Sequence, residues 1–330
     1  MRTGFFIFPN SSFKTKFRME YNHLFGPVRS RRLGRSLGVD MIPFKTCNCN
    51  CVYCECGGAP PAPHTRAEYV PSEEVIEELD SYLSGRPDID FITFAGSGEP
   101  TLNSGLGKVV GFVKDRFPSY PAALLTNGTL FHLAAVREEA LPFDLVCPSL
   151  DAVTPEAFNR INRPHVGLDL PEIITGLTEF SRIFKGQLWI EVFIVPGIND
   201  TPEELKLFRE VLTAMQPARV QLNSLDRPGA CDWVAPAAIS TLSTIAQFLQ
   251  PLPVEIIARN SADIQQPLSH PDNLDGTILH QLRRRPATVE EIAVMCSATI
   301  NEVRPTIDRL SAEGRISEAK VNGRNFYRVS

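Results

Sequence analysis

The sequence predicts an α/β protein with a partial (β/α)6 barrel of the TIM type and a C-terminal winged-helix domain. The first observation is that short apolar runs alternate with helix signals from Leu37 to Ala258. Alternation with crossover connections implies a parallel sheet, and six or seven repeats over about 220 residues favour a barrel over a doubly wound sheet. The second observation is that the pattern changes after Asp272 to three helices and a hairpin.

The predicted barrel strands are rich in β-branched and aromatic residues and are bounded by Gly and Pro. Helices are predicted between them, with Ser72, Thr154 and Thr201 as N-caps and with Glu204 closing a capping box on Thr201. Function in such barrels lies at the carboxyl ends of the strands. The predicted strands are Leu37–Ile42, Ile89–Ala95, Ala122–Thr126, Leu145–Ser149, Leu188–Val195, Arg219–Ser224 and Val254–Ile257.

The C-terminal pattern is helix, helix-turn-helix and a two-stranded wing. Thr288 and Glu291 have the spacing of a capping box, Gly314 ends the last helix, and Asn322 and Gly323 form the hairpin turn. The predicted helices are Gly276–Arg285, Thr288–Met295 and Thr299–Glu313, and the hairpin is Arg315–Val329.

Composition limits the class of protein. The chain has 330 residues, 43% of them hydrophobic, and a net charge of −5, which offers no general argument for binding nucleic acid or membranes. No apolar run approaches the ~18–20 residues of a membrane span. Eight cysteines in a chain of this length suggest a reducing cytoplasm, and metal binding rather than disulfides.

The domain organisation follows from these patterns. Residues 1–23 are predicted to be an extension, either disordered or preceding a true start at Met19, because the first 18 residues carry basic but no acidic side chains. The barrel covers 24–260, a polar linker covers 261–271, and the winged-helix domain covers 272–330.

The feature with the clearest chemistry is the spacing of Cys47, Cys51 and Cys54, which is C-x3-C-x2-C. Three thiolates at this spacing can bind three irons of a cubane [4Fe–4S] cluster and leave the fourth iron open, whereas a structural cluster normally takes four cysteines. Zinc sites usually show a second C-x2-C or Cys/His pair, which is lacking here. Cys49 and Cys56 are interpreted as bystanders, with a spare ligand or a redox role as the alternative.

A second candidate segment, Gly96-Ser97-Gly98-Glu99-Pro100, follows the second predicted strand. Glycines let a backbone approach a ligand closely, and a carboxylate accepts hydrogen bonds from an amine. The alternative is an ordinary glycine-rich turn with a solvated Glu99.

Polar residues also end later strands. Asn127 follows the third strand, Ser149 and Asp151 follow the fourth, and Asn199 follows the fifth. They are candidates for ligand binding, and local turn capping is the alternative. Residues that end the sixth strand, Gln221 and Asn223, are candidates for facing substrate.

These motifs together resemble the radical S-adenosylmethionine (radical SAM) enzymes. The resemblance implies that Cys47, Cys51 and Cys54 hold a [4Fe–4S] cluster. It also implies that the segment Gly98-Glu99-Pro100 receives the amine of SAM, and that Asn127, Ser149 and Asp151 contact its carboxylate and ribose. Asn199 would lie near the adenine.

A longer resemblance, over roughly Leu24 to Ile257, is to uncharacterised Fe–S oxidoreductases related to the tRNA wyosine-base synthases. It rests on the segment Phe25–Gly38 and on Asn162-Arg163-Pro164 and Leu225-Asp226-Arg227-Pro228. Four arginines of the first segment, Arg29, Arg31, Arg32 and Arg35, could bind an anion or pair with carboxylates. The wyosine synthases hold a second cluster through cysteines upstream of the motif, and this chain has no cysteine before Cys47, so their reaction is not carried over.

The resemblance implies reductive cleavage of SAM to a 5′-deoxyadenosyl radical that abstracts hydrogen from an unknown substrate, a peptide, protein or RNA. An electron donor such as a flavodoxin or ferredoxin would be needed, and Cys231 is a candidate hydrogen donor. The rival hypothesis is an iron–sulfur regulator that binds DNA through the winged helix. Residues 272–330 hold nine basic and eight acidic side chains, which disfavours DNA. The wing is instead expected to dock a protein or peptide, with a lid or a nucleic-acid surface as alternatives.

Overall fold

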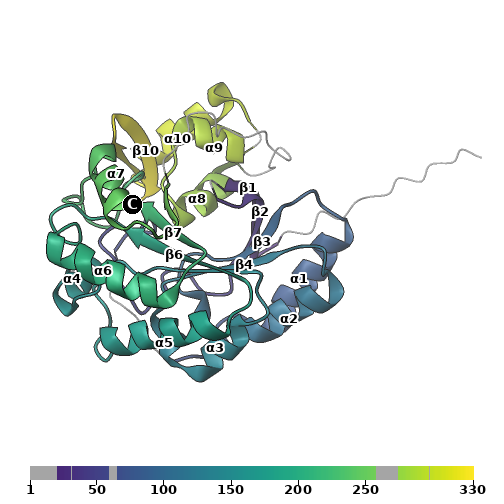
Figure 1. Cartoon of the computed structure of the whole chain (residues 1–330). Coiled ribbons are helices and arrows are strands. Elements are labelled where there is room, and N and C mark those ends of the chain that lie inside the picture. The colour runs from purple at the N-terminus through teal and green to yellow at the C-terminus, as the bar shows by residue number, and fades with distance from the viewer. Residues whose placement is uncertain (1–20, 31, 59–64, 258–273, 297) are drawn as a thin grey trace, which may run out of the picture.

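The computed structural model describes residues 21–30, 32–58, 65–257, 274–296 and 298–330. Over these residues the chain forms an eight-stranded sheet flanked by helices, followed by three helices and a two-stranded sheet (Figure 1). The prediction of an α/β fold with a parallel sheet is confirmed. The predicted linker and most of the predicted N-terminal extension lie outside the described residues.

All seven predicted strands are present, with ends displaced by three residues or fewer from the prediction. An eighth strand, β1, precedes them. The large sheet consists of β1 Leu24–Ser30, β2 Gly34–Val39, β3 Phe91–Phe94, β4 Ala122–Thr126, β5 Leu145–Pro148, β6 Gln187–Phe193, β7 Arg219–Asn223 and β8 Val254–Ile256.

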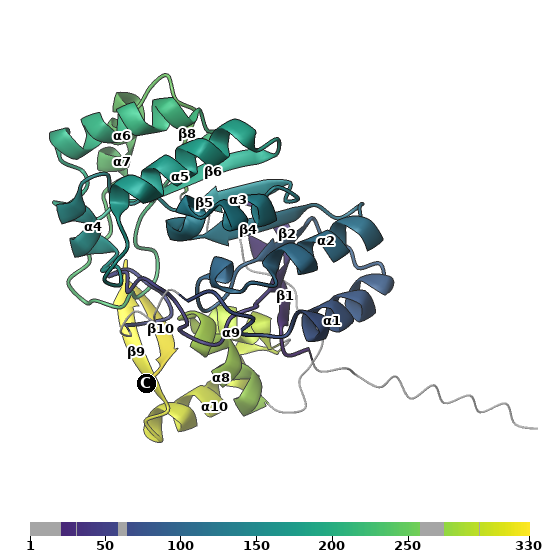
Figure 2. The same ribbon diagram turned by 90° about the horizontal axis from the view of Figure 1, so that it is seen from below.

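The strands follow one another across the sheet in chain order, from β1 to β8. Strands β2 to β8 are parallel, so their carboxyl ends meet at one edge. A sequential order is that of a barrel wall, whereas a doubly wound sheet reverses its order near the middle. Figure 2 shows the strands running side by side from the β1 end towards the β8 end.

Strand β1 was not predicted. It pairs antiparallel with β2 at the edge of the sheet, and its register shifts between Phe25 and Val28. That irregularity contains Pro27, a residue that cannot donate to a ladder and is tolerated at edges and bulges. The proline and the arginines that follow it hide the strand's alternating pattern.

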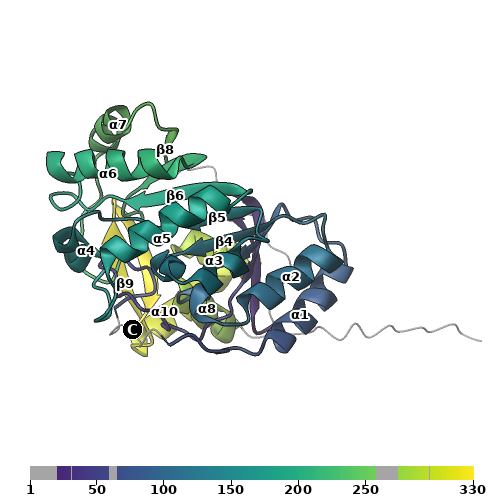
Figure 3. The same cartoon turned by 60° about the horizontal axis from the view of Figure 1, so that its bottom comes forward.

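The helices connecting the parallel strands pack on one face of the sheet, as Figures 1 and 3 show for α1, α2, α3, α5 and α6. Two 3-10 turns, η1 Pro100–Leu102 and η2 Thr129–His132, follow β3 and β4. The helices are α1 Ser72–Ser84, α2 Leu106–Arg116, α3 Ala134–Ala140, α4 Pro155–Ile161, α5 Leu170–Ile183, α6 Pro202–Met215 and α7 Ile239–Phe248.

Two of the three N-caps predicted for the helices between the barrel strands are confirmed. Thr154 caps α4 and Thr201 caps α6, each accepting a backbone hydrogen bond. The prediction for Ser72 was wrong, because Ser72 lies inside α1 and its hydroxyl donates to Glu68. Only one of the two hydrogen bonds of the predicted capping box on α6 forms. The Glu204 amide donates to Thr201 Oγ1, but the Glu204 carboxylate accepts from Thr154 Oγ1 instead of from the Thr201 amide.

A single apolar core fills the space between the sheet and its helices. Its largest fully buried side chains are Phe94, Phe131, Phe180 and Phe208, which come from β3, η2, α5 and α6. In the part of the chain that the structure describes, no helix has the length and apolar character needed to cross a membrane.

The C-terminal part has its own core. Helix α8 (Leu274–Arg284), α9 (Val289–Met295) and α10 (Ile300–Ala312) are followed by the hairpin of β9 (Ile316–Val321) and β10 (Arg324–Val329). Thr288 and Glu291 form the predicted capping box. The core is built from apolar side chains of all three helices and both strands, including Ile278, Ile292, Val303, Ile307, Leu310, Ile316 and Tyr327.

Arg227, in the loop after β7, connects the two parts. Its side chain is only 7% exposed, and its guanidinium donates to Glu291 of α9 at 2.7 Å and to the Pro286 carbonyl at 2.7 Å. The same group lies 5.6 Å from the centre of the Phe326 ring of β10. A buried charge must be paired and hydrogen-bonded, so this one side chain ties the C-terminal part to the large sheet.

The packing of α5 on η2 leads to a test with two helical glycines. A Cβ on Gly176 would lie 2.4 Å from the Phe131 carbonyl oxygen, whereas a Cβ on Gly111 of α2 meets nothing within 4 Å. We expect Gly176→Ala to lower the free energy of unfolding by about 1–3 kcal/mol through overpacking. Gly111→Ala should raise it by roughly 0.5–1 kcal/mol, because alanine loses less backbone entropy. Urea unfolding followed by circular dichroism measures both, and equal effects would contradict the packing argument.

Candidate active site

The three predicted cluster ligands lie in the loop after β2, at the carboxyl edge of the sheet. Cys47, Cys51 and Cys54 are each half-buried and unbridged. Backbone hydrogen bonds fix the loop. The Val52 amide donates to the Ile161 carbonyl at 2.9 Å. The Val52 carbonyl in turn accepts from the amide of Cys231 at 2.9 Å.

The surroundings of the thiols differ. A hydrogen bond with the Cys56 thiol and the ammonium of Lys45 lower the pKa of Cys54 to about 6, against the opposing effect of burial. The Lys45 Nζ lies 3.9 Å from Cys54 Sγ. Burial raises the pKa of Cys47, and the nearby Cys51, Glu99 and Cys54 raise it further. The neutral thiol of Cys47 is therefore favoured in the absence of a bound cation, which would stabilise the thiolate form.

Among the described residues, no three His, Cys, Asp or Glu side chains are placed to hold a single metal ion. The donor set of the three thiols, with its C-x3-C-x2-C spacing, is the one that would hold an iron–sulfur cluster.

The two additional cysteines bond to predicted ligands. Cys49 is buried and its thiol is hydrogen-bonded with Cys51, which raises the pKa of Cys49. Cys56 is hydrogen-bonded with Cys54. Both interpretations of these residues, bystander and spare ligand, stay open.

The glycine-rich segment after β3 packs directly on the cysteine loop. A Cβ on Gly98 would lie 2.2 Å from the Thr46 carbonyl oxygen, so only glycine allows this approach. The Glu99 amide donates to that same carbonyl at 3.0 Å, and the Lys45 amide donates to the Ser97 carbonyl at 2.9 Å. Pro100 then begins η1. The two segments singled out from the sequence therefore form one unit.

The Glu99 carboxylate is buried, with 2% of the residue exposed, and it accepts four hydrogen bonds. The Thr101 amide and hydroxyl donate to Oε1 at 3.0 and 2.5 Å, as does the Thr126 hydroxyl at 2.5 Å. The Asn127 amide donates to Oε2 at 2.7 Å. Burial raises the pKa of Glu99, and these donors oppose the rise. The alternative of a solvated Glu99 was wrong, because the carboxylate joins η1 to the end of β4.

Asn127 lies beside the cysteine loop. Its Nδ2 donates to Asn48 Oδ1 at 2.8 Å and lies 3.6 Å from Cys47 Sγ. Its Oδ1 accepts from the amide and hydroxyl of Thr129, which begins η2. Asn127 therefore both caps a turn and reaches a predicted ligand.

Asp151 forms a second buried carboxylate site. It accepts from the Tyr53 hydroxyl at 2.5 Å, from Asn162 Nδ2 at 2.7 Å and from the Phe193 amide at 2.9 Å. Burial raises the pKa of Asp151 to about 6, with the Tyr53 hydrogen bond the largest opposing effect. The Tyr53 ring stacks on the Phe193 ring with centroids 3.8 Å apart. Asn162 Nδ2 also lies 3.4 Å from Cys51 Sγ.

The remaining predicted site residues differ in character. Ser149 is half-buried at the end of β5, beside β6. Asn199 is fully buried, and its amide group bonds the carbonyls of Asp151 and Phe193 and the amide of Val195. The structure thus gives Asn199 the turn role that the sequence left as the alternative, and its place near an adenine stays a prediction.

The predicted arginine cluster separates into ion pairs. Arg32 is paired with Glu191 of β6 and donates to Gln221 Oε1 at 3.1 Å. Arg35 is paired with Asp88. For these two arginines the structure supports the pairing interpretation. Arg31 lies outside the described residues, as does the side chain of Arg29.

Two further expectations concern Gln221 and Asn223. Gln221 is fully buried and engaged by Arg32, and Asn223 is 9% exposed with its Oδ1 accepting from the Ser224 amide. Neither is open to solvent in this structure. The polar contacts of Asn162 and Glu191 were not predicted. Asn162 ends α4 and belongs to the segment Asn162-Arg163-Pro164 that carries part of the longer resemblance, whereas Glu191 lies inside β6 and no sequence signal pointed to it.

The chain is similar to several known proteins. The radical SAM superfamily matches residues 41–210. The UPF0026 protein of Helicobacter pylori strain J99 is 34% identical over 307 residues, covering 92% of this chain and 96% of that protein. A protein of Brachyspira hyodysenteriae strain ATCC 49526 / WA1 named GTPase Obg is 35% identical over 325 residues, 96% of this chain, and the chain spans 46% of that protein's length.

A solved structure of TYW1 with a lysine-pyruvate adduct bound has a TM-score of 0.50 and 19% identity, covering 65% of this chain and 72% of that one. This likeness concerns the fold. The chain belongs to the radical SAM superfamily and groups within it with the UPF0026 proteins. It is therefore an enzyme. None of these similarities supports the alternative of a DNA-binding regulator.

The four hydrogen bonds to Glu99 lead to a stability test. We expect Glu99→Gln to lower the free energy of unfolding by about 2–4 kcal/mol, because an amide NH2 group would then face buried donors. Glu210→Gln on the exposed face of α6 is the matched control and should stay within about 0.5 kcal/mol of the wild type. Denaturant unfolding measures both, and a neutral Glu99→Gln would show that the carboxylate is not required.

Proposed function

We propose that this enzyme binds a [4Fe–4S] cluster through Cys47, Cys51 and Cys54 and uses it to cleave SAM reductively. When bound, the cluster supplies the single electron that splits SAM into methionine and a 5′-deoxyadenosyl radical, which abstracts hydrogen from the substrate. The observation that carries the proposal is the superfamily match over residues 41–210, which contains the three half-buried thiols at the carboxyl edge of the sheet.

In this proposal, the polar side chains around the thiols adjust the reduction potential of the cluster. Lys45 favours the thiolate form of Cys54, and the amides of Asn127 and Asn162 point at the sulfurs of Cys47 and Cys51. Hydrogen bonds and charges near cluster sulfurs set the reduction potential. These three residues would therefore tune the ease of electron transfer.

The SAM-binding role of the predicted residues is part of the proposal. Gly98 brings the backbone close to the cysteine loop, and Glu99 and Pro100 follow it. Asn127 and Ser149 have side chains at the same edge, which suits contacts with the polar groups of SAM. Asp151 accepts hydrogen bonds from Tyr53 and Asn162 and holds both side chains in place. It would position these two residues for SAM in addition to contacting SAM itself.

The architecture also belongs to the proposal. We regard the large sheet as a partial barrel and residues 274–330 as a winged-helix domain, because three helices precede a two-stranded wing. The substrate would be a peptide, a protein or an RNA, and the electron would come from a flavodoxin or ferredoxin.

The test is an anaerobic assay. The protein is reconstituted with iron and sulfide, SAM and dithionite are added, and 5′-deoxyadenosine is quantified. We expect the wild type to form this product and Cys51→Ala to form none, because one cluster ligand is missing.

The control is Cys296→Ala, which removes a buried thiol from the separate C-terminal core. It should keep both the cluster absorption and the product. A wild-type [4Fe–4S] cluster whose reduced EPR signal does not change when SAM is added would contradict the proposal.

A further inference from the structure

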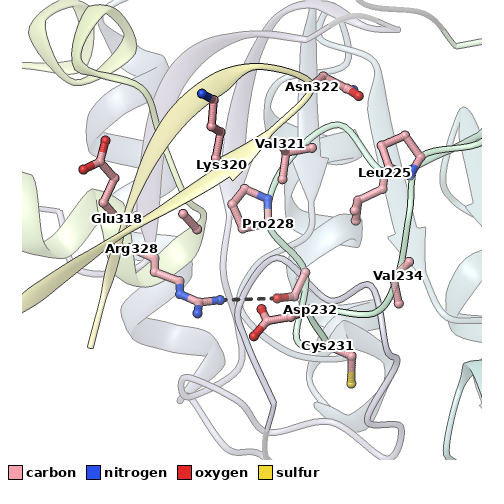
Figure 4. Close-up of a pocket in the computed structure, with 13 residues that line it drawn as sticks. Leu225, Pro228, Cys231, Asp232, Val234, Glu318, Lys320, Val321, Asn322 and Arg328 are labelled. Carbon is pink, nitrogen blue, oxygen red and sulfur yellow. Dashed lines mark hydrogen bonds between the residues drawn. The ribbon is translucent and has the colours of Figure 1, made fainter.

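A groove lies between the loop after β7 and the C-terminal hairpin. It has a volume of about 450 Å³. One wall is formed by Leu225, Pro228 and Val234 of the loop, and the other by five consecutive residues, 318–322, of the hairpin. Figure 4 shows this arrangement, with Arg328 donating to the Gly229 carbonyl at its base.

The hairpin presents the backbone edge of β9 to the groove. Side chains alternate between the two faces of a strand, so a wall of five consecutive residues is made by the strand's edge. From β10, in contrast, only Arg328 lines the groove. The other edge of the hairpin is covered, because Tyr327 of β10 exchanges two backbone hydrogen bonds with Ala287 at 2.8 and 3.0 Å.

The register shows which groups of β9 face outward. Asn322 and Gly323 have φ of 50° and 74°, the pattern of a two-residue type I′ turn. Val321 and Arg324 flank the turn as a hydrogen-bonded pair, so the pairs at Lys320 and Glu318 direct their N–H and C=O groups away from β10. Tyr327, opposite Glu318, bonds outward to Ala287, which agrees with this register.

The base of the groove rests on the cysteine loop. A Cβ on Gly229 would lie 2.9 Å from Tyr53 Cα. The Cys231 amide donates to the Val52 carbonyl at 2.9 Å. A chain lying in the groove would therefore be held next to the loop that carries Cys51 and Cys54.

The charge of the groove is balanced. Asp232 and Glu318 oppose Lys320 and Arg328, while Leu225, Val234 and Val321 give it apolar surface. Polyanions such as RNA bind where positive charge dominates. An exposed strand edge, in contrast, is complemented by another extended backbone.

We propose that this groove binds an extended polypeptide segment of the substrate, which pairs with β9 as a third strand. The proposal rests on the enzyme function proposed above and names its substrate class as a peptide or protein. The N–H and C=O groups of Glu318 and Lys320 supply the pairing, and the apolar wall receives an uncharged side chain.

The test uses a random dodecapeptide library displayed on phage and panned against the anaerobically reconstituted protein. An enriched peptide is labelled with fluorescein and titrated by anisotropy. Lys320→Pro removes one outward N–H and should weaken binding by about tenfold or more, the loss of one hydrogen bond plus a steric conflict.

The matched control is Asn325→Pro. Asn325 lies directly opposite Lys320 on β10, so its outward N–H points to the other edge of the hairpin. Both proline variants spare the β9–β10 hydrogen bonds, and circular dichroism verifies folding of each. We expect Asn325→Pro to bind within about threefold of the wild type, and hydrogen exchange at Glu318 and Lys320 to slow when the peptide is added.

Several results would overturn the groove as a peptide site. These are a library without enriched peptides, an enriched peptide that binds Lys320→Pro as tightly as the wild type, displacement of the peptide by unfractionated tRNA, and a dimer that Lys320→Pro dissociates. Peptide binding needs neither SAM nor reductant. If no peptide binds but the protein still forms 5′-deoxyadenosine, the peptide-groove proposal is therefore overturned and the proposed enzyme function is not. If a peptide binds in a Lys320-dependent way but the protein forms neither a [4Fe–4S] cluster nor 5′-deoxyadenosine, only the proposed enzyme function is overturned.

Discussion

The buried Glu99 carboxylate is the interaction on which the arrangement of the site depends. Its two oxygens bring together the 3-10 turn after β3, the last residue of β4 and the backbone of Asn127. The Glu99 amide meanwhile bonds the cysteine loop through Thr46. Removing a charge from water is costly unless donors surround it. The segments must therefore converge for the carboxylate to be tolerated, and their convergence shapes the edge where the thiols lie.

The same logic recurs around the site. Asp151 gathers Tyr53, Asn162 and the end of β6, and Arg227 gathers α9 and β10 onto the loop after β7. Arg227 also lies 3.7 Å from Glu55, the residue after Cys54. The C-terminal part is therefore joined to the cysteine loop through one buried guanidinium and through the floor of the groove.

Most of the strands, turns and helix caps were predictable, because each depends on a pattern of residues close together in the sequence. Hydrophobic runs and turn residues indicated all seven parallel strands and the hairpin turn at Asn322 and Gly323. The N-caps at Thr154, Thr201 and Thr288 rest on neighbours three residues away. Strand β1 was not predicted from the sequence, because its bulge interrupts the alternation of apolar and polar residues on which strand prediction depends.

The sequence by itself determined that a loop with three suitably spaced thiols leaves the end of a parallel strand, since spacing and periodicity are properties of adjacent residues. Only the tertiary structure decided which polar groups meet: Arg32 and Glu191 pair across 159 residues, and Asn162 reaches Cys51 across 111. The sequence likewise could not place β9 against the loop after β7. Arginine, glutamate and asparagine are common residues, and their partners depend on the path of the whole chain, which no local pattern encodes.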